Sequence, residues 1–243
     1  MVELLFYRKI VAIDKDKHRH LHIGTIKDYR FAAESNSVPI AVVEFFEAAR
    51  EYPIVFAGKT GPTPLPAVLL GLRNNENLFV GDSGKWNARY IPAFVRRYPF
   101  VLADTGNDQL LVCVDAGHPV VGDSNGQALF TLEGEATPFL NNAINFMRDF
   151  QAESRRTNEF MQRIIELDLL TEVSARAELK GGAAHQLGGF SVVNESKFRA
   201  LDREVVEEFF RKGWLSFIDA HLISLGNLGP LIDRMTTGKR KAV

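Results

Sequence analysis

Three arginines stand close before tyrosine-proline pairs, where their chemistry suits the binding of a negatively charged group. Arg50 lies three residues before Pro53. Arg96 and Arg97 lie three and two residues before Pro99. A guanidinium group offers a planar fork of donors to a carboxylate or phosphate, and aromatic rings suit flat or extended ligands. We therefore predict a cleft for an anion or a peptide. Its predicted lining is Arg50, Tyr52, Trp86, Arg89, Tyr90, Arg96, Arg97 and Tyr98.

A structural interpretation of the same residues stands beside this one. The arginines would pair with Glu44, Glu47 or Glu51, and the aromatic rings would belong to the core. Amphipathic side chains commonly combine packing with one polar partner. That general behaviour favours the structural interpretation.

Three histidines, His18, His20 and His22, occupy alternate positions. In an extended strand they would share one face, as a metal site requires. Lys17 and Arg19 stand between them, and no cysteine is near. We favour a solvated strand edge and predict no metal site.

His221 lies in a helical segment among apolar neighbours such as Ile218 and Leu222. The favoured interpretation is a neutral, hydrogen-bonded histidine inside the C-terminal helices. The functional alternative is a pH-sensitive or ligand-facing group beside Asp219 and Asn227. His221 and Asn227 are therefore kept as candidate binding residues.

Cys113 is the only cysteine and sits in an apolar strand pattern, where a thiol packs as a small hydrophobe. A nucleophilic dyad with His118 would need a lowered thiol pKa. The nucleotide and hydrolase patterns GxxxxGK[ST], GxGxxG, HExxH, CxxC and GxSxG do not occur. We predict no catalytic residue and no cofactor.

The net charge and the cysteine count limit which partners and which cellular compartment we expect for this chain. The 243 residues include 29 Lys and Arg against 30 Asp and Glu, a net charge of -1. This balance argues against binding to nucleic acid or to an anionic membrane. A single cysteine excludes an intramolecular disulfide and fits a reducing compartment. Charges follow the short apolar run at residues 4–7, so we expect no signal peptide, no membrane span and a cytoplasmic protein.

The predicted cleft belongs to a short unit that the chain uses twice, at residues 37–57 and 90–103. Each copy has a proline, an apolar helical patch, an arginine, Tyr-Pro and a strand-like run. In the first copy we expect a helix to begin at Pro39, with Val42, Phe45, Phe46 and Ala49 on one apolar face and Glu44 largely off it. Pro53 then ends this helix.

The remaining elements follow from hydrophobic spacing, caps and turn residues. Strands are expected at residues 4–13, 21–23 and 54–57, and hairpins at 67–72 with 77–80, 98–103 with 109–115, and 171–179 with 187–193. Helices are expected at residues 138–168, with a break near Ser154 as the alternative to one continuous helix, and at 195–200 after the Asn194 cap, 202–211 before Gly213, and 214–225. We expect a helix stop at residues 226–230.

These elements predict an α+β fold in a single unit spanning residues 1–243. Residues 1–135 form a β-rich portion with short helices, residues 136–235 form a mainly helical portion with one β-hairpin, and residues 236–243 form a basic tail. Residues 201–228 are rich in large apolar side chains. Core packing is the favoured explanation, with a homodimer face as the alternative.

Short motifs spread along the chain match one known family. They include Asn36-Ser37-Val38-Pro39, Ala48-Ala49-Arg50-Glu51-Tyr52-Pro53, Arg89-Tyr90-Ile91-Pro92, Glu166-Leu167-Asp168-Leu169-Leu170 and Ala220-His221-Leu222-Ile223-Ser224. On these motifs, the chain resembles the SapC-like proteins of bacteria over nearly its whole length. The family takes its name from a surface-layer locus, and many similar proteins are encoded near TonB-dependent outer-membrane receptors and flavin-dependent tryptophan-halogenase-like enzymes. The resemblance implies no reaction and no catalytic residue.

Together these observations favour a non-catalytic intracellular binding or accessory protein that holds a partner protein or peptide. The resemblance links it to outer-membrane receptor uptake or to a halogenase-like partner. One alternative is a surface-layer-associated protein exported without a cleaved signal. Another is an enzyme with no recognisable motif, which would need a polar pocket and a titrating His221 or Cys113.

Overall fold

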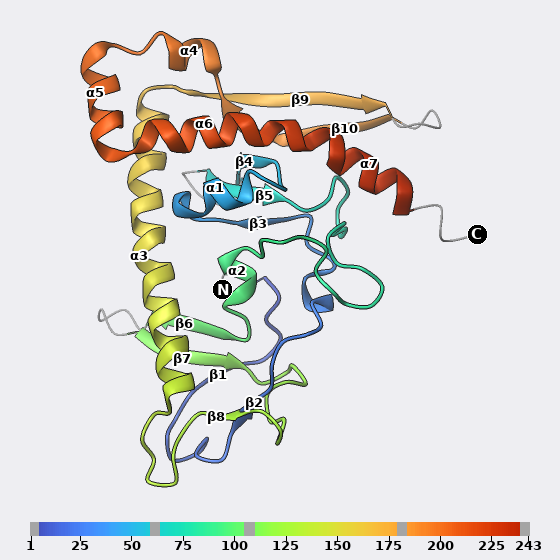
Figure 1. The fold of residues 1–243 in the computed structure, drawn as a ribbon, viewed down its shortest axis with the longest axis vertical. Coiled ribbons are helices and arrows are strands. Elements are labelled where there is room, and N and C mark those ends of the chain that lie inside the picture. Colours follow the sequence, from blue (N-terminus) through green and yellow to red (C-terminus); the bar gives the residue numbers. More distant parts are fainter. Residues whose placement is uncertain (1–4, 59–63, 105–109, 179–183, 239–243) are drawn as a thin grey trace.

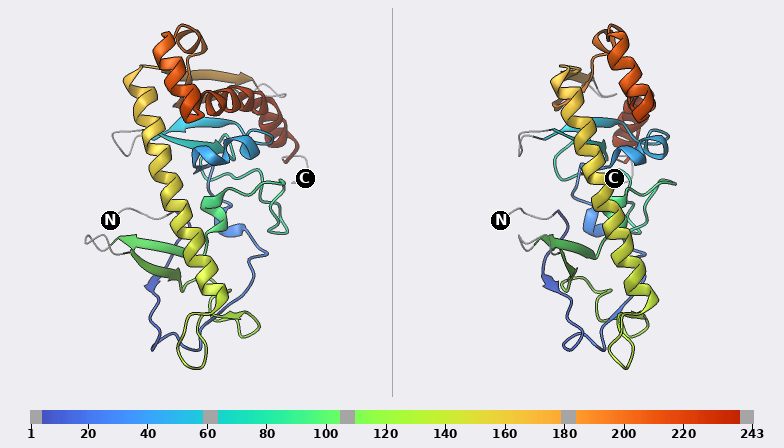
Figure 2. Two further views of the ribbon diagram at one scale, coloured as in Figure 1. Left: turned by 60° about the vertical axis from the view of Figure 1, so that its left-hand side comes forward. Right: turned by 90° about the vertical axis from the view of Figure 1, so that its left-hand side faces the viewer.

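The computed structural model describes residues 5–58, 64–104, 110–178 and 184–238, which combine helices and sheets in the predicted α+β class. A five-stranded sheet lies near one end of the elongated molecule and a smaller sheet nearer the other (Figure 1). The long helix α3 (Pro138–Glu166) runs beside both (Figures 1 and 2). It therefore connects the two halves of the fold.

The five-stranded sheet draws strands from both ends of the sequence. Its order is β3 (Ser37–Pro39), β5 (Leu65–Leu69), β4 (Ile54–Ala57), β10 (Ala184–Val193) and β9 (Leu170–Glu178). The β9–β10 hairpin is as predicted, and β10 joins β4 by antiparallel pairing of Phe190 with Ala57. The C-terminal hairpin thus completes a sheet that the N-terminal strands begin.

The remaining strands form two smaller sheets. One has the order β1 (Ile10–Ala12), β7 (Leu110–Asp115) and β6 (Phe100–Asp104), and the other pairs β2 (His22–Ile23) with β8 (Gln127–Ala128). The antiparallel pairing of β6 with β7 confirms the predicted hairpin. The first strand is shorter than predicted, because only Ile10–Ala12 pairs.

The helices besides α3 are mostly short. In chain order they are η1 (Arg30–Ala32), η2 (Val42–Glu44), α1 (Phe45–Ala48), α2 (Ala93–Arg96), α4 (Glu195–Arg199), α5 (Arg203–Lys212), α6 (Trp214–Ser224), η3 (Leu225–Asn227) and α7 (Leu228–Gly238). Asn194 caps α4 through a bond from the Lys197 N–H to its side chain, as predicted. Gly213 ends α5 at φ 72°, a left-handed conformation that glycine adopts readily.

Helix α3 contributes side chains to both hydrophobic clusters of the fold. Its N-terminal Leu140 and Met147 pack in the smaller cluster, and its C-terminal Phe160 and Ile164 pack in the larger one around the five-stranded sheet. The start is capped by Thr137, whose hydroxyl accepts a bond from the Leu140 N–H. The helix is unbroken over 29 residues, which confirms the long predicted helix.

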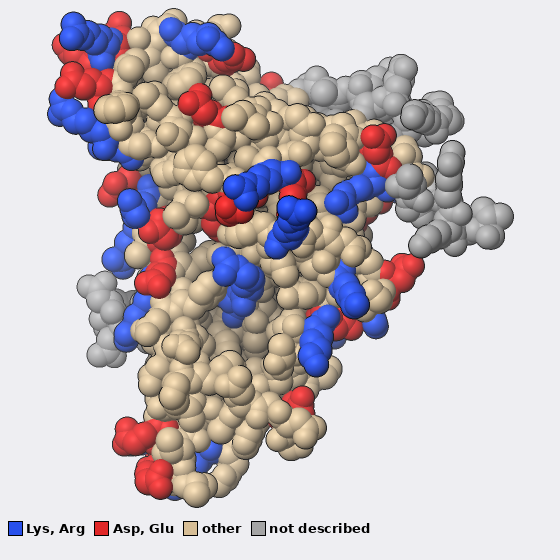
Figure 3. Space-filling view, viewed as in Figure 1, with Lys and Arg blue, Asp and Glu red and all other residues tan. Residues whose placement is uncertain are grey.

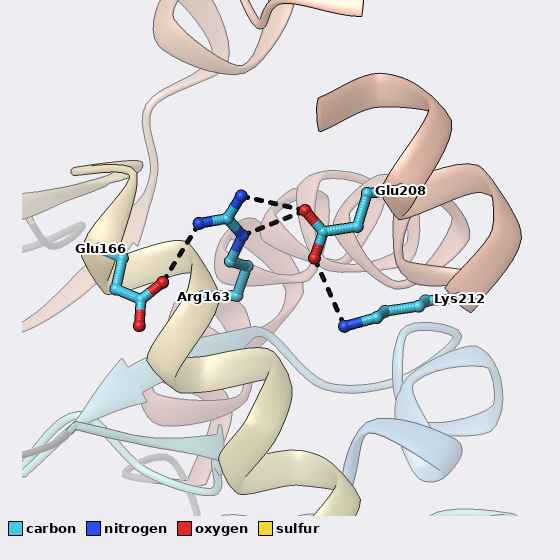
Figure 4. Close-up of polar contacts among 4 residues, drawn as sticks. All are labelled: Arg163, Glu166, Glu208 and Lys212. Carbon is cyan, nitrogen blue, oxygen red and sulfur yellow. Dashed lines mark hydrogen bonds and ion pairs between the residues drawn. The ribbon is translucent and has the colours of Figure 1, made fainter. Parts of the chain in front are cut away.

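Ion pairs attach α5 to the C-terminal end of α3 (Figure 4). Arg163 contacts Glu208 at 3.0 Å and Glu166 at 3.1 Å, and Lys212 contacts Glu208 at 3.3 Å. The Arg163 bond lowers the pKa of Glu208. Of these three pairs, the Arg163–Glu208 pair joins the two helices, and such partly exposed pairs add little to stability because water weakens them.

Two predicted elements are wrong. Pro39 lies in β3, opposite Ala67, and the first helix instead begins after Ala41. Since β3 is at the edge of its sheet, a residue without an N–H can take that place. Residues 77–80 are not a strand: one bond, from the Leu78 N–H to the Leu70 carbonyl at 2.8 Å, joins them to the predicted partner, while β5 pairs with β3 and β4.

Two further predictions near the termini also need correction. The helix does not stop at residues 226–230, since η3 and α7 continue it to Gly238. Pro230 falls in the first turn of α7, where a missing N–H costs no helical bond. Residues 236–238 are therefore helical, and residues 239–243 of the predicted tail lie outside the described part. The strand edge predicted for His18 and His20 is a series of turns.

The C-terminal helical run has one property that the sequence analysis did not expect. Among the described residues, the stretch Trp214–Thr236 is long and apolar enough to span a membrane by length and composition alone. A buried core helix passes the same test, and Trp214, Ile218 and Leu231 are buried here. However, only 28% of the most apolar 18-residue part of this stretch is buried.

Candidate functional site

The candidate site is organised by the carboxylate of Glu44, whose residue is only 5% exposed. One oxygen accepts a bond from the Ala41 N–H at 2.8 Å. The other accepts bonds from the Ala93 N–H and the Tyr90 hydroxyl, each at 2.7 Å. Glu44 thus connects the starts of the two helices of the repeated unit.

The prediction that Glu44 lies largely off the apolar face, and so outside the core, is wrong, since the residue is buried. Glu44 is the third residue after the N-cap Ala41, the position from which a glutamate reaches back to the N-cap N–H. That spacing is a signal in the sequence for the first bond. No local signal identifies the bonds to Tyr90 and Ala93, which lie more than forty residues away.

A second carboxylate fixes the same segment from its other side. Glu51 accepts bonds from the Arg89 N–H at 2.8 Å and from the Tyr90 N–H at 2.9 Å. The donors of both bonds are backbone N–H groups, so the guanidinium group of Arg89 takes no part in them. Among the described residues, no carboxylate pairs with the Arg89 side chain.

These residues surround a surface hollow of about 410 Å³, lined by Glu47, Arg50, Glu51, Arg89 and Tyr90. Arg50 pairs with Glu47 at 3.0 Å, in the way that the structural interpretation predicted. The pair is mostly exposed, so water weakens it. The hollow therefore retains one unpaired guanidinium group at Arg89.

Arg96 extends this surface, because its guanidinium group lies against the ring of Tyr90. Its guanidinium carbon lies 5.7 Å from the Tyr90 ring centre and 5.2 Å from that of Phe146. Its Nε donates to the Ile91 carbonyl at 2.9 Å. Arg96 also lines a hollow of about 360 Å³ with Phe139 and Phe146.

We call Arg50, Arg89, Tyr90 and Arg96 the arginine-tyrosine strip. Figure 3 shows Lys and Arg side chains gathered over the middle of the face where α1 and α2 lie in Figure 1. Arg96, like Arg89, has no carboxylate partner among the described residues. The strip can thus bind an anionic group without first breaking an ion pair at these two positions.

Three aromatic residues of the predicted cleft are buried instead of lining this surface: Tyr52, Trp86 and Tyr98. Trp86 donates to the Tyr52 hydroxyl at 2.8 Å, and Tyr52 in turn donates to the Tyr90 carbonyl. Tyr98 donates to Asp115 at 2.9 Å. Burial raises the pKa of Tyr52 and of Tyr98. Tyr52 and Trp86 therefore support Tyr90 from the interior, whereas Tyr98 bonds to Asp115 in the other half of the fold.

Arg97 also serves packing. Its guanidinium carbon lies 4.0 Å from the Phe94 ring centre and 5.0 Å from that of Phe150, between α2 and α3. Burial lowers the pKa of Arg97 and raises the pKa of the neighbouring Tyr7 to about 12. Arg97 is therefore partly buried against these rings, although it borders the same hollow as Arg96.

His221 and Asn227 hold the C-terminal helices against the sheet. His221 is fully buried, and its Nε2 accepts a bond from the Val193 N–H at 3.0 Å. Burial lowers the pKa of His221 to about 4, against a weak opposing effect of the Ile54 backbone. Asn227 donates to the carbonyls of Ala49 and Tyr52 at 2.7 and 3.2 Å. His221 is thus neutral at pH 7.

The surroundings of Cys113 do not activate its thiol. The residue is 3% exposed and burial raises the pKa of the thiol. Its hydrogen-bond partner is the Leu111 carbonyl, whereas His118 contacts the rings of Phe31 and Tyr98. No group of three His, Cys, Asp or Glu side chains suited to a metal ion occurs in the part of the chain that the structure describes.

Comparison with known proteins identifies the family. The SapC family model matches residues 13–231. The chain belongs to the SapC family. All four residues of the strip, together with Glu44 and Glu51, lie within the SapC match. No curated protein and no solved structure matches the chain.

Replacing Glu44 by glutamine tests the role of its carboxylate in this SapC structure. Glu44→Gln places an amide donor against one of the backbone N–H donors, so we expect a loss of about 1 to 3 kcal/mol in unfolding free energy. Urea denaturation measures it. The control is Glu47→Gln, whose carboxylate is exposed and should cost less than about 1 kcal/mol. Equal losses for both variants would contradict the assignment.

The buried His221 predicts a pH dependence of stability. Its pKa is about 4 in the folded chain and about 6.5 when unfolded, so only the unfolded chain takes up the proton between these values. The stability is complete above about pH 6.5 and falls towards pH 4, by about 3 kcal/mol in total. We expect His221→Gln to show a shallower fall than the wild type in urea titrations. The same slope for both proteins would show that His221 is not the titrating group.

Proposed function

We propose that this SapC-family chain is a non-catalytic binding protein that holds an acidic segment of a partner protein or peptide on the arginine-tyrosine strip. The observation that supports it is the pair of guanidinium groups at Arg89 and Arg96, which have no carboxylate partner among the described residues and both lie near Tyr90. A carboxylate bound there would gain charge-assisted hydrogen bonds. The Tyr90 ring would give an apolar contact beside them.

The backbone bonds at this site favour binding because they fix the segment beforehand. Glu51 holds the N–H groups of Arg89 and Tyr90, and Glu44 holds the Tyr90 hydroxyl and the Ala93 N–H. A surface already ordered loses less entropy when a partner binds. We propose that the protein works in the cytoplasm. The first partners to test are the receptor-uptake and halogenase-like proteins suggested by the family resemblance.

A capture experiment tests this function. Tagged wild-type chain is compared with Arg89→Ala/Arg96→Ala in a lysate of the source cells, with mass spectrometry as the readout. The control is Arg199→Ala/Arg211→Ala, which removes the same charge from two exposed, ion-paired arginines. We expect one set of proteins to be captured by the wild type and the control but lost with Arg89→Ala/Arg96→Ala.

Affinity for a captured partner should fall by at least about tenfold in that variant, since each charge-assisted bond contributes about 1.5 to 3 kcal/mol. Urea denaturation of all three proteins shows whether folding is retained. Capture of the same proteins by all three would refute the assignment of the strip.

A second candidate function is attachment at the cell envelope or surface without a cleaved signal. It is favoured by the apolar run Trp214–Thr236, with Ile223 72% exposed. Phe210, in the preceding helix, is 74% exposed. Fractionation of the source cells into cytosol, envelope and medium tests it. Recovery in the envelope or medium, lost on Phe210→Ser/Ile223→Ser, would support this candidate, and recovery only in the cytosol would exclude it.

A further inference from the structure

A hollow of about 400 Å³ lies outside the strip and belongs to no function described above. It is bordered by Arg8, by the segment from Thr25 to Phe31, and by the turn from Gly117 to Val120. Its volume falls in the range of about 300 to 1,000 Å³ that is usual for small-molecule sites. Size alone therefore suits a small ligand.

The charges around this hollow are unbalanced. Arg8, Lys27 and Arg30 line it, against the single carboxylate of Asp28. Asp28 pairs with Arg30 at 3.3 Å. Neither Arg8 nor Lys27 pairs with a carboxylate among the described residues. The lining residues thus carry an excess of two positive charges, of which the neighbouring Asp115 carboxylate offsets one, whereas the hollow of the strip has two arginines and two glutamates.

The two sides of the hollow are held together by the buried carboxylate of Asp115. It accepts bonds from the N–H groups of Arg8 and Gly117, each at 3.0 Å, and from the Tyr98 hydroxyl at 2.9 Å. Burial opposes the charge, but these donors, with the Lys9 N–H, keep the pKa of Asp115 below its usual value. The ionised Asp115 carboxylate therefore holds the backbone of Arg8 and of Gly117 together on the two sides of the hollow.

His118 adds a neutral donor. Its Nδ1 accepts a bond from the Val120 N–H at 3.3 Å, so the ring proton is on Nε2. Burial lowers the pKa of His118, although Asp115 and Asp28 oppose this. Among the described residues, no acceptor bonds to Nε2, and the residue lines the hollow. A ligand oxygen can therefore use this N–H.

Aromatic and apolar groups make up the rest of the lining. The rings of Phe31 and Tyr98 stack at 4.1 Å between centres, and the His118 ring lies nearly perpendicular to both. Pro119 and Val120 extend this apolar side. A ligand that carries only a charge would leave this side of the hollow unused.

We propose that this hollow is a binding site for a small organic anion, in which a carboxylate or phosphate group faces Arg8, Lys27 and His118 and a ring contacts the apolar side. Arginine and lysine bind both kinds of oxyanion. The site goes beyond the proposed function, because it shares no residue with the strip.

Calorimetric titration tests the site with four probes: phenyl phosphate, benzoate, inorganic phosphate and benzyl alcohol. We expect at least one of the two aromatic anions to bind saturably, and more tightly than inorganic phosphate, with no binding of benzyl alcohol. The ratio of phenyl phosphate to benzoate affinity then identifies the oxyanion. Absence of saturable binding by both aromatic anions would overturn the proposal.

Charge-matched variants locate the binding. Arg8→Gln/Lys27→Gln changes two exposed residues of the hollow, whereas Arg155→Gln/Arg203→Gln removes the same charge from α3 and α5. We expect the first variant to weaken binding of the preferred anion at least about tenfold and the second to leave it within about twofold of the wild type. Equal weakening by both would show attraction to overall charge and would refute this site.

Discussion

The buried Glu44 carboxylate is the interaction on which the candidate surface depends. A carboxylate taken out of water is costly unless donors satisfy it, and here three donors do so. Two of them come from the second copy of the repeated unit, so satisfying this charge requires the two copies to lie together. The position of Tyr90 at the surface follows from that requirement. The exposed arginines on either side are then placed by backbone that is already fixed.

The repeated unit shows how similar local sequences acquire different roles. Both copies fold as a short helix, a buried tyrosine, a proline and a strand. However, β4 lies within the five-stranded sheet, whereas β6 lies at the edge of the three-stranded sheet. Tyr52 bonds to Tyr90, while Tyr98 bonds to the buried Asp115. The same short pattern thus supports the strip in one copy and the basic hollow in the other.

The sequence predicted the local elements better than the contacts between them. The long helix, the Asn194 cap and the Gly213 stop depend on residues within a few positions, and they could be predicted. The pairing of β4 with β10 and the bond from the Tyr90 hydroxyl to the Glu44 carboxylate join distant segments, for which one sequence contains no spacing signal. For the same reason, the predicted cleft separated into a surface strip and a buried support. Arg96 and Arg97 are adjacent in sequence, yet Arg96 is exposed and Arg97 is partly buried. This difference depends on how the end of α2 packs against α3, which the sequence alone does not show.

The most direct test of the account is site-specific photo-crosslinking in the source cells. A benzophenone amino acid would replace Glu47, which lines the hollow of the strip but is not one of its arginines, and, as a comparison, the exposed Phe210 or Ile223 in two other proteins. We expect a discrete crosslinked partner from position 47 and none from positions 210 and 223. Crosslinks from the C-terminal helices with none from position 47 would contradict the proposed role of the strip, because the partner or membrane would then contact the apolar helical run.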